Sequence, residues 1–224
     1  GDASRMKKVI FFIYVSLFIL NWGKAWSLIE VDITRGNLNP LPLAVSPLSV
    51  DQKSKEKFKD LLKLDDIGAE ISKVVENNLR QSGLFNPLDP KAFLQKPDIA
   101  HVKPRFEDWA LIKAQALITG EVKIVDEKLR VEFRLWDVLA GKEIMALAFT
   151  TVSENWRRVG HIITDKVYQR LTGEKGYFDT RIIYVAEEGL KTSRIKKLAI
   201  MDQDGFNTKY LTLGNELVLT PRFN

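Results

Sequence analysis

Three segments within residues 116–151 alternate apolar and polar residues, and only short connections separate them. The middle segment shows the pattern most clearly, because charged residues stand between four apolar ones, Leu129, Val131, Phe133 and Leu135. Alternation of period two is typical of a strand that buries one face. Connections as short as residues 126–128 and 140–142 join antiparallel neighbours. The sequence therefore predicts a three-stranded antiparallel meander, whose apolar face other elements must cover.

Two amphipathic segments flank the meander and can provide that cover. The first follows a capping aspartate, ends at Gly83 and has an apolar stripe at helical spacing: Ile67, Ile71, Val74, Val75 and Leu79. The second begins at Ser153, ends at Gly173 and has a similar stripe: Trp156, Val159, Ile163, Val167 and Leu171. A shorter helix is predicted at residues 106–114, with Trp109 facing inward.

With residues 43–45 as a further short strand, residues 40–174 are predicted to form an α+β domain. Its sheet is mixed and largely antiparallel, and its helices lie on one face. The densely basic residues 53–63 are typical of a solvated loop or helix face, and a binding patch is the less favoured alternative. Trp136 alternates with charged residues, which leaves an exposed position open.

The hydrophobic pattern changes in residues 175–224, where no helical periodicity is found. Three short β-rich runs at regular spacing, residues 181–186, 196–201 and 208–213, predict one sheet of a repeated all-β architecture. Such a sheet cannot bury both faces alone, so we expect further repeats to follow. The sequence Asp-Gln-Asp-Gly at residues 202–205 resembles the start of a calcium loop, but later ligands are out of register. A tight turn is the favoured interpretation.

Residues 6–27 have the layout of a signal peptide, and residues 1–5 are interpreted as a tag remnant. Two lysines precede an apolar run of 12 residues, 9–20, whereas a membrane-spanning helix needs roughly 20. Ala25 and Ser27 supply the small residues that signal peptidase requires. We expect cleavage after Ser27, with Ala25 as the second choice, and export of the protein. A buried core helix and an uncleaved anchor are the alternatives.

The charge does not favour nucleic-acid binding. The formal net charge is +5, but residues 1–27 contain four basic residues and one acidic residue, so the remainder carries only +2. A protein that depends on phosphate contacts has a larger and clustered basic excess. The chain has no cysteine, which excludes disulfides and thiolate metal sites.

The motifs of an enzyme are also missing from the sequence. It has two histidines and neither H-E-x-x-H nor G-x-S-x-G. His101 lies in a polar, proline-flanked region and is expected at the surface. His161 precedes Asp165 by four residues on one helical face, which we interpret as a structural pair and not as half of a catalytic relay. No catalytic, cofactor-binding or metal-binding residue is predicted.

The first residues after the expected cleavage site alternate again. Ile29, Val31 and Ile33 are apolar, and the residues between them are polar. The pattern predicts a strand, although a terminal position also suits a mobile arm.

The junction between the two parts resembles the TolB family. The resemblance is strongest from W-R-R-V-G-H at residues 156–161 to Val185, through the intervening Asp165, Leu171, Gly173, Gly176, Phe178, Thr180, Arg181 and Tyr184. Residues 202–207 resemble the hairpin turn of a TolB-type blade. The order of a signal peptide, a short segment, an α+β domain and then blades is also similar. The resemblance implies a six-bladed propeller, of which residues 175–224 are an incomplete β-propeller of about one blade.

The resemblance further implies a non-enzymatic, monomeric adaptor in the periplasm that supports envelope integrity and outer-membrane constriction during cell division. In the family, the segment after the signal peptide binds the periplasmic domain of the inner-membrane protein TolA. Here it is residues 28–39, with the partner-binding positions Ile29, Glu30, Val31, Asp32, Ile33, Thr34 and Arg35. The propeller binds the lipoprotein Pal, largely through residues beyond Asn224. A nucleic-acid binder and a periplasmic hydrolase stay as alternatives, against which the weak charge and the missing nucleophile motif count.

Export predicts that the protein recovered from the periplasm begins at Leu28, or at Trp26 if the second cleavage site is used. N-terminal sequencing measures this directly. A protein that still carried residues 6–20 would contradict the signal-peptide interpretation.

Overall fold

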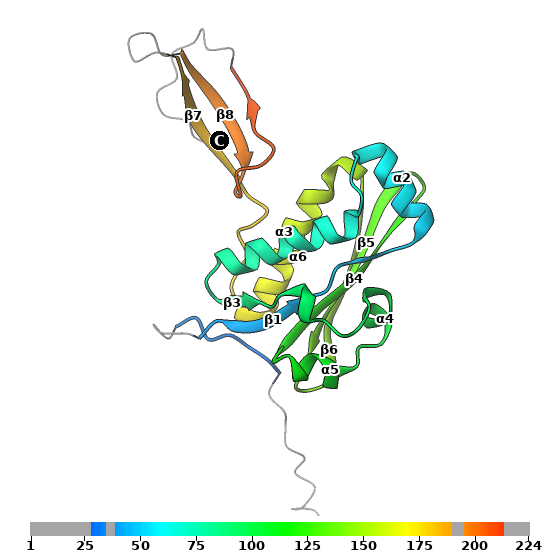
Figure 1. Ribbon diagram of the computed structural model, residues 1–224. Coiled ribbons are helices and arrows are strands. Elements are labelled where there is room, and N and C mark those ends of the chain that lie inside the picture. Colours follow the sequence, from blue (N-terminus) through cyan, green and yellow to red (C-terminus); the bar gives the residue numbers. More distant parts are fainter. Residues whose placement is uncertain (1–27, 35–38, 190–194, 213–224) are drawn as a thin grey trace, which may run out of the picture.

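The computed structural model describes residues 28–34, 39–189 and 195–212 (Figure 1). The predicted signal peptide, residues 1–27, and the end of the predicted blade, residues 213–224, lie outside the described residues. Among the helices that are described, none is long and apolar enough to span a membrane.

The meander predicted from the alternation is confirmed. β4 (Ala116–Val125), β5 (Lys128–Asp137) and β6 (Lys142–Thr151) pair antiparallel in sequence order. In the turn between β4 and β5, Asp126 and Glu127 have φ angles of 48° and 61°. Positive φ at both central residues is the signature of a type I′ turn, whose twist matches that of the strands it joins.

Parallel strands extend the sheet on the β4 side. β1 (Leu41–Val45) pairs with β4, β3 (Phe85–Pro87) pairs with β1, and β2 (Ser49–Val50) also pairs with β4. The order is β3-β1-β4-β5-β6, so the sheet is mixed and largely antiparallel, as predicted. β3 was not predicted, because Pro87 marks a turn in sequence; at the sheet edge a proline is tolerated within a strand.

The two long predicted helices cover one face of the sheet. α3 (Ile67–Gln81) and α6 (Trp156–Thr172) lie together there (Figure 1), and their apolar stripes form much of the main core. η2 (Ser153–Asn155) leads into α6. The helices approach closely at Gly160, where an added Cβ would lie 2.8 Å from Val74 Cγ1. The lack of a side chain at Gly160 therefore sets this helix–helix distance.

The basic segment is also helical, since residues 53–63 correspond to α2 (Gln52–Leu62). Phe58 of this helix is buried, whereas its lysines are exposed or half-exposed. The predicted solvated helix face is therefore confirmed. Ser54 Oγ accepts the amide of Ile124 at 3.1 Å, which ties α2 to β4.

Short helices cover part of the opposite face: η1 (Pro90–Ala92), α4 (Pro97–Val102) and α5 (Phe106–Leu111). Trp109 of α5 is buried as predicted, and its Nε1 donates to Gln95 Oε1 at 3.1 Å. Trp136 is also buried, so the alternative of an exposed position is wrong. Its Nε1 donates to Thr119 Oγ1 at 2.9 Å, which gives the indole N–H a hydrogen-bond partner in the protein interior.

The expectation that His101 lies at the surface is wrong. α4 packs against the sheet, and His101 is only 5% exposed. A helix of six residues is too short to show an apolar stripe, so its polar and proline-rich surroundings concealed the buried face.

A second, smaller sheet follows α6 and corresponds to the predicted blade region (Figure 1). β7 (Arg181–Glu188), β8 (Ile195–Asp202) and β9 (Lys209–Tyr210) pair antiparallel in that order. The three predicted strands are therefore present, and the third is shorter than residues 208–213.

The close helix contact predicts that Gly160→Ala destabilises the protein. Alanine improves helix propensity by about 1 kcal/mol, but its Cβ would enter the space of Val74, a β-branched side chain with little rotamer freedom. We expect a lower melting temperature, with the loss largely relieved in the Gly160→Ala/Val74→Ala double variant relative to Val74→Ala. A higher melting temperature for Gly160→Ala alone would contradict this account.

Candidate functional site

The N-terminal arm, defined as residues 28–39, contacts the α+β domain through its backbone. The amide of Ile29 donates to Asp137 Oδ2 at 2.9 Å, and the amide of Val31 donates to the carbonyl of Leu171 at 2.6 Å. Val31 is 9% exposed and belongs to the main core, against which Ile29 also packs. Residues 29–31 are therefore docked beside the C-terminal end of α6.

The predicted strand is not formed in the described part of the arm. Residues 28–32 have no regular secondary structure, and a turn follows in which Thr34 N and Oγ1 donate to Asp32 Oδ1 at 2.9 and 2.6 Å. Burial nevertheless alternates along these residues, because Glu30 is exposed and lies between Ile29 and Val31, which pack on the domain. Ile33, the third apolar residue, is 36% exposed and does not join the core. Arg35 lies outside the described residues.

The middle of α6 holds the linker to the second sheet. Asp165 accepts the amides of Phe178 at 2.7 Å and Asp179 at 3.1 Å. Gly176 passes so close that a Cβ there would lie 2.3 Å from Asp165 Oδ1. Phe178 is 1% exposed, which anchors the linker further.

The N-terminal half of α6 holds the turn that follows β8. Arg157 forms an ion pair with Asp204 at 2.5 Å, and its guanidinium lies 3.8 Å from the ring centroid of Phe206. Within the turn, Asn207 Nδ2 donates to Asp202 Oδ2 at 2.7 Å, and Gly205 has a φ of 85°. The favoured interpretation of residues 202–207 as a tight turn is therefore confirmed.

His161 links α6 to both α3 and this turn. Its Nδ1 lies 2.9 Å from Asn78 Nδ2, and Asn78 Oδ1 accepts from Gln203 Nε2 at 3.0 Å. Asn78 must therefore use its amide hydrogens toward His161, which makes Nδ1 an acceptor and puts the proton of the neutral ring on Nε2. That nitrogen faces Asp204 Oδ2 at 3.6 Å and Asp202 Oδ2 at 3.8 Å.

The predicted pairing of His161 with Asp165 is wrong, although His161 does lie at the junction. The Asp165 carboxylate is used by the linker amides, and the His161 ring faces α3 and the turn instead. His161 is 2% exposed, and this burial holds its pKa below the ordinary value despite the raising effect of Asp204 and Asp202. Arg157 lowers the pKa further, so the neutral ring is favoured.

A cleft of about 390 Å³ lies between the start of α6 and the second sheet. Its lining includes Arg158 and Asp179, which pair at 3.0 Å, and also Asp202 and Lys209. The Arg158–Asp179 ion pair joins α6 to the linker at this cleft, so part of its charged lining has a structural role.

Sequence reasoning missed the residues that complete this junction. Asn78 lies in the last turn of α3, and Gln203 lies in the turn after β8, 125 residues away. The only signal was the resemblance of residues 156–161 and 202–207 to a known junction and turn, which marked the region without naming the contacts.

Comparisons with known proteins agree with this architecture. A family model described as the TolB amino-terminal domain matches residues 29–144, and one described as the TolB beta propeller domain matches residues 168–224. The Tol-Pal system protein TolB of Pelagibacter ubique (strain HTCC1062) is 82% identical over 208 residues, which are 93% of this chain and 47% of that protein. The chain thus spans about half the length of the curated relative it matches.

A solved structure shows the same fold. The crystal structure of TolB from Acinetobacter baumannii superposes with a TM-score of 0.62 and a sequence identity of 22%. The match covers 81% of this chain and 41% of that one.

The burial of His161 predicts a pH-dependent stability with a definite sign. Because its pKa is lowered on folding, the unfolded chain binds more protons, so stability is lost as the pH falls through the ordinary value of about 6.5. His101 also has a lowered pKa, so the comparison must be made between variants. We expect the melting temperature to drop less from about pH 8 to about pH 5.5 in His161→Gln than in the parent. Equal drops would contradict the assignment.

Proposed function

The chain belongs to the TolB family, and from this membership we propose that it acts as a non-enzymatic periplasmic adaptor of the Tol-Pal system. The arm binds the periplasmic domain of TolA, and the propeller binds the lipoprotein Pal. This link between the inner and outer membranes maintains the cell envelope and supports outer-membrane constriction during division. The observation that carries the proposal is the docked part of the arm, which has the sequence of a strand but forms no strand pairing in its described residues.

The arm has the chemistry of a peptide that adds a strand to a partner's sheet. Such a peptide binds through its main chain, while alternate side chains enter pockets on one face. Ile29, Val31 and Ile33 supply the alternate apolar side chains. Two of the three face the protein's own domain, so the complete apolar face becomes available to TolA only when the arm is released.

The arm can be released because the free energy gained from its docking contacts is close to the free-energy cost of ordering the residues that make them. Burying Val31 stabilises by about 1.5–3 kcal/mol, and the backbone hydrogen bonds of Ile29 and Val31 contribute about 0.5–1.5 kcal/mol each. Fixing the backbone of residues 29–31, which make these contacts, costs about 1–2 kcal/mol each. For these three residues the docked and released states therefore differ little in free energy, and a partner can shift the balance.

Helix α6 offers a route by which Pal binding can influence the arm. The arm docks on Leu171 at one end of α6, while the blade turn is held by Arg157 near the other end. A change in the contact between the blade turn and Arg157 would therefore act on the same helix that accepts the amide of Val31. In the family, the Pal-binding residues lie largely in the part of the propeller that follows the position of Asn224, so none is assigned to this chain.

Deletion of residues 28–39 tests the arm directly. If they are a partner peptide, the deletion abolishes binding to the TolA periplasmic domain, measured by calorimetry, and changes the melting temperature little. The point variant Ile33→Ser should weaken binding at least tenfold with no change in melting temperature, because Ile33 is exposed. Leu94→Ser is the matched control, since Leu94 is 59% exposed and lies outside the arm.

Two outcomes would contradict the proposal. If the deletion variant bound TolA with undiminished affinity, the interaction would lie on other residues. If the deletion lowered the melting temperature strongly and Ile33→Ser bound normally, the arm would be a fixed part of the domain.

A further inference from the structure

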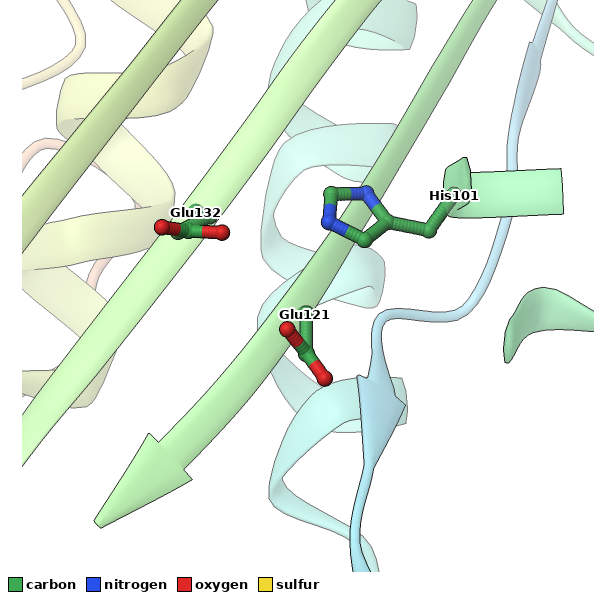
Figure 2. A group of neighbouring side chains, drawn as sticks. All are labelled: His101, Glu121 and Glu132. Atoms are coloured by element: carbon green, nitrogen blue, oxygen red, sulfur yellow. The ribbon is translucent and has the colours of Figure 1, made fainter. Parts of the chain in front are cut away.

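Three metal-ligand side chains converge on the sheet face opposite α3 and α6. His101 projects from α4, Glu121 from β4 and Glu132 from β5, and Figure 2 shows the imidazole ring directed toward the two carboxylates. One ligand atom from each residue lies within 4.8 Å of the others. The arrangement plays no part in the arm or in the blade junction.

The two glutamates are placed where carboxylates repel each other. Glu121 and Glu132 are directly opposite in the β4–β5 register, and like charges in such cross-strand pairs are destabilising. Lys123 pairs with Glu121 Oε2 at 2.9 Å, and Arg130 pairs with Glu132 Oε1 at 2.7 Å. Each carboxylate thus has one oxygen engaged by a neighbour, and the described residues provide no hydrogen bond to the other oxygen.

His101 is the second, independent indication of a ligand. Its side chain is 5% exposed, and its Nδ1 is fully buried without a hydrogen-bond partner. Within the described residues Nε2 has no hydrogen-bond partner either. Buried polar groups almost always have partners, so a buried imidazole without any hydrogen bond calls for an explanation. In Figure 2 its Nε2 is the ring nitrogen on the side of the two carboxylates, so Nε2 is the atom that could bind a ligand between them.

The alternative explanation is that the four charged residues only form ion pairs along the sheet surface, and that His101 packs against them without a ligand. These ion pairs account for Lys123 and Arg130, but they give His101, whose Nδ1 is buried, no hydrogen bond. The second histidine cluster shows the contrast. At His161 the hydrogen bond with Asn78 puts the ring proton on the nitrogen that faces Asp202 and Asp204, and Arg157 already pairs with Asp204. His161 Nε2 is also buried without a hydrogen bond, but it carries the ring proton, so no lone pair of His161 is directed at its carboxylates.

We propose that His101, Glu121 and Glu132 form a binding site for a divalent transition-metal ion, with Zn²⁺ as the best match. One imidazole and two carboxylates are a ligand set that suits Zn²⁺, whereas Ca²⁺ and Mg²⁺ prefer oxygen ligands alone. Three protein ligands leave the fourth tetrahedral position to water. Zinc–ligand distances of about 2.0–2.2 Å require the donors to move closer together, which the half-exposed glutamates can do by rotation.

The bound ion would fasten α4 to the strands beneath it. α4 is otherwise a single short helix, held near the site by a long hydrogen bond of 3.4 Å from Arg134 Nη1 to the carbonyl of His101. A cation between Glu121 and Glu132 also removes their mutual repulsion. The ion would therefore stabilise this packing, and the site does not depend on the proposed adaptor function.

The test is Zn²⁺ binding to the chain prepared without a polyhistidine tag and treated with a chelator. We expect calorimetry to give one Zn²⁺ per chain, with a melting temperature that rises on binding. Co²⁺ in place of Zn²⁺ should give the visible absorption of a tetrahedral site. Glu121→Gln and Glu132→Gln keep the side-chain shape and should each weaken binding at least tenfold, as should His101→Gln.

Two control variants make the outcome specific. His161→Gln alters the other histidine cluster, and Glu143→Gln removes a carboxylate from β6 that pairs with Arg134; both should bind Zn²⁺ like the parent. The proposal is overturned if the parent does not bind Zn²⁺, if Mg²⁺ binds equally well, or if His161→Gln loses binding while Glu121→Gln and Glu132→Gln retain it.

Discussion

The close packing of α6 against α3 is the contact on which the other features depend. Gly160 lets the two helices approach at Val74, and this brings Asn78 within hydrogen-bonding distance of His161. Along the same helix, Arg157 holds the blade turn, Asp165 caps the linker and Leu171 accepts the arm. One helix thus fixes the positions of the arm, the domain and the second sheet relative to each other.

The sequence predicted the elements whose periodicity is long and regular. The meander and helices α3 and α6 follow from repeated apolar positions and from clear caps and turns. It did not predict β3, because Pro87 indicates a turn by sequence, whereas at a sheet edge a proline can be part of a strand. His101 was misplaced, and His161 was given the wrong partner, since its partners come from α3 and from the blade turn, which no local pattern connects.

The arm shows how a single alternation can serve two binding states. Its pattern predicted a strand, yet in the described residues Ile29 and Val31 face the domain without strand pairing. Their amides bond a side-chain carboxylate and a helix C-terminal carbonyl, which are not strand partners. A segment with the sequence of a strand that forms no strand pairing in its described residues is suited to pair with the sheet of another protein. Its exposed residues, such as Ile33, are then the first available to that partner.

Amide hydrogen exchange in the arm, measured with and without the TolA periplasmic domain, tests the central claim most directly. In the free protein, the docked Val31 amide should exchange more slowly than its neighbours but faster than the amides of β5, because the arm releases often. With TolA bound, protection should extend to alternate amides beyond Ile33, as strand addition requires. Unchanged exchange throughout residues 28–39 in a fully bound complex would contradict the account.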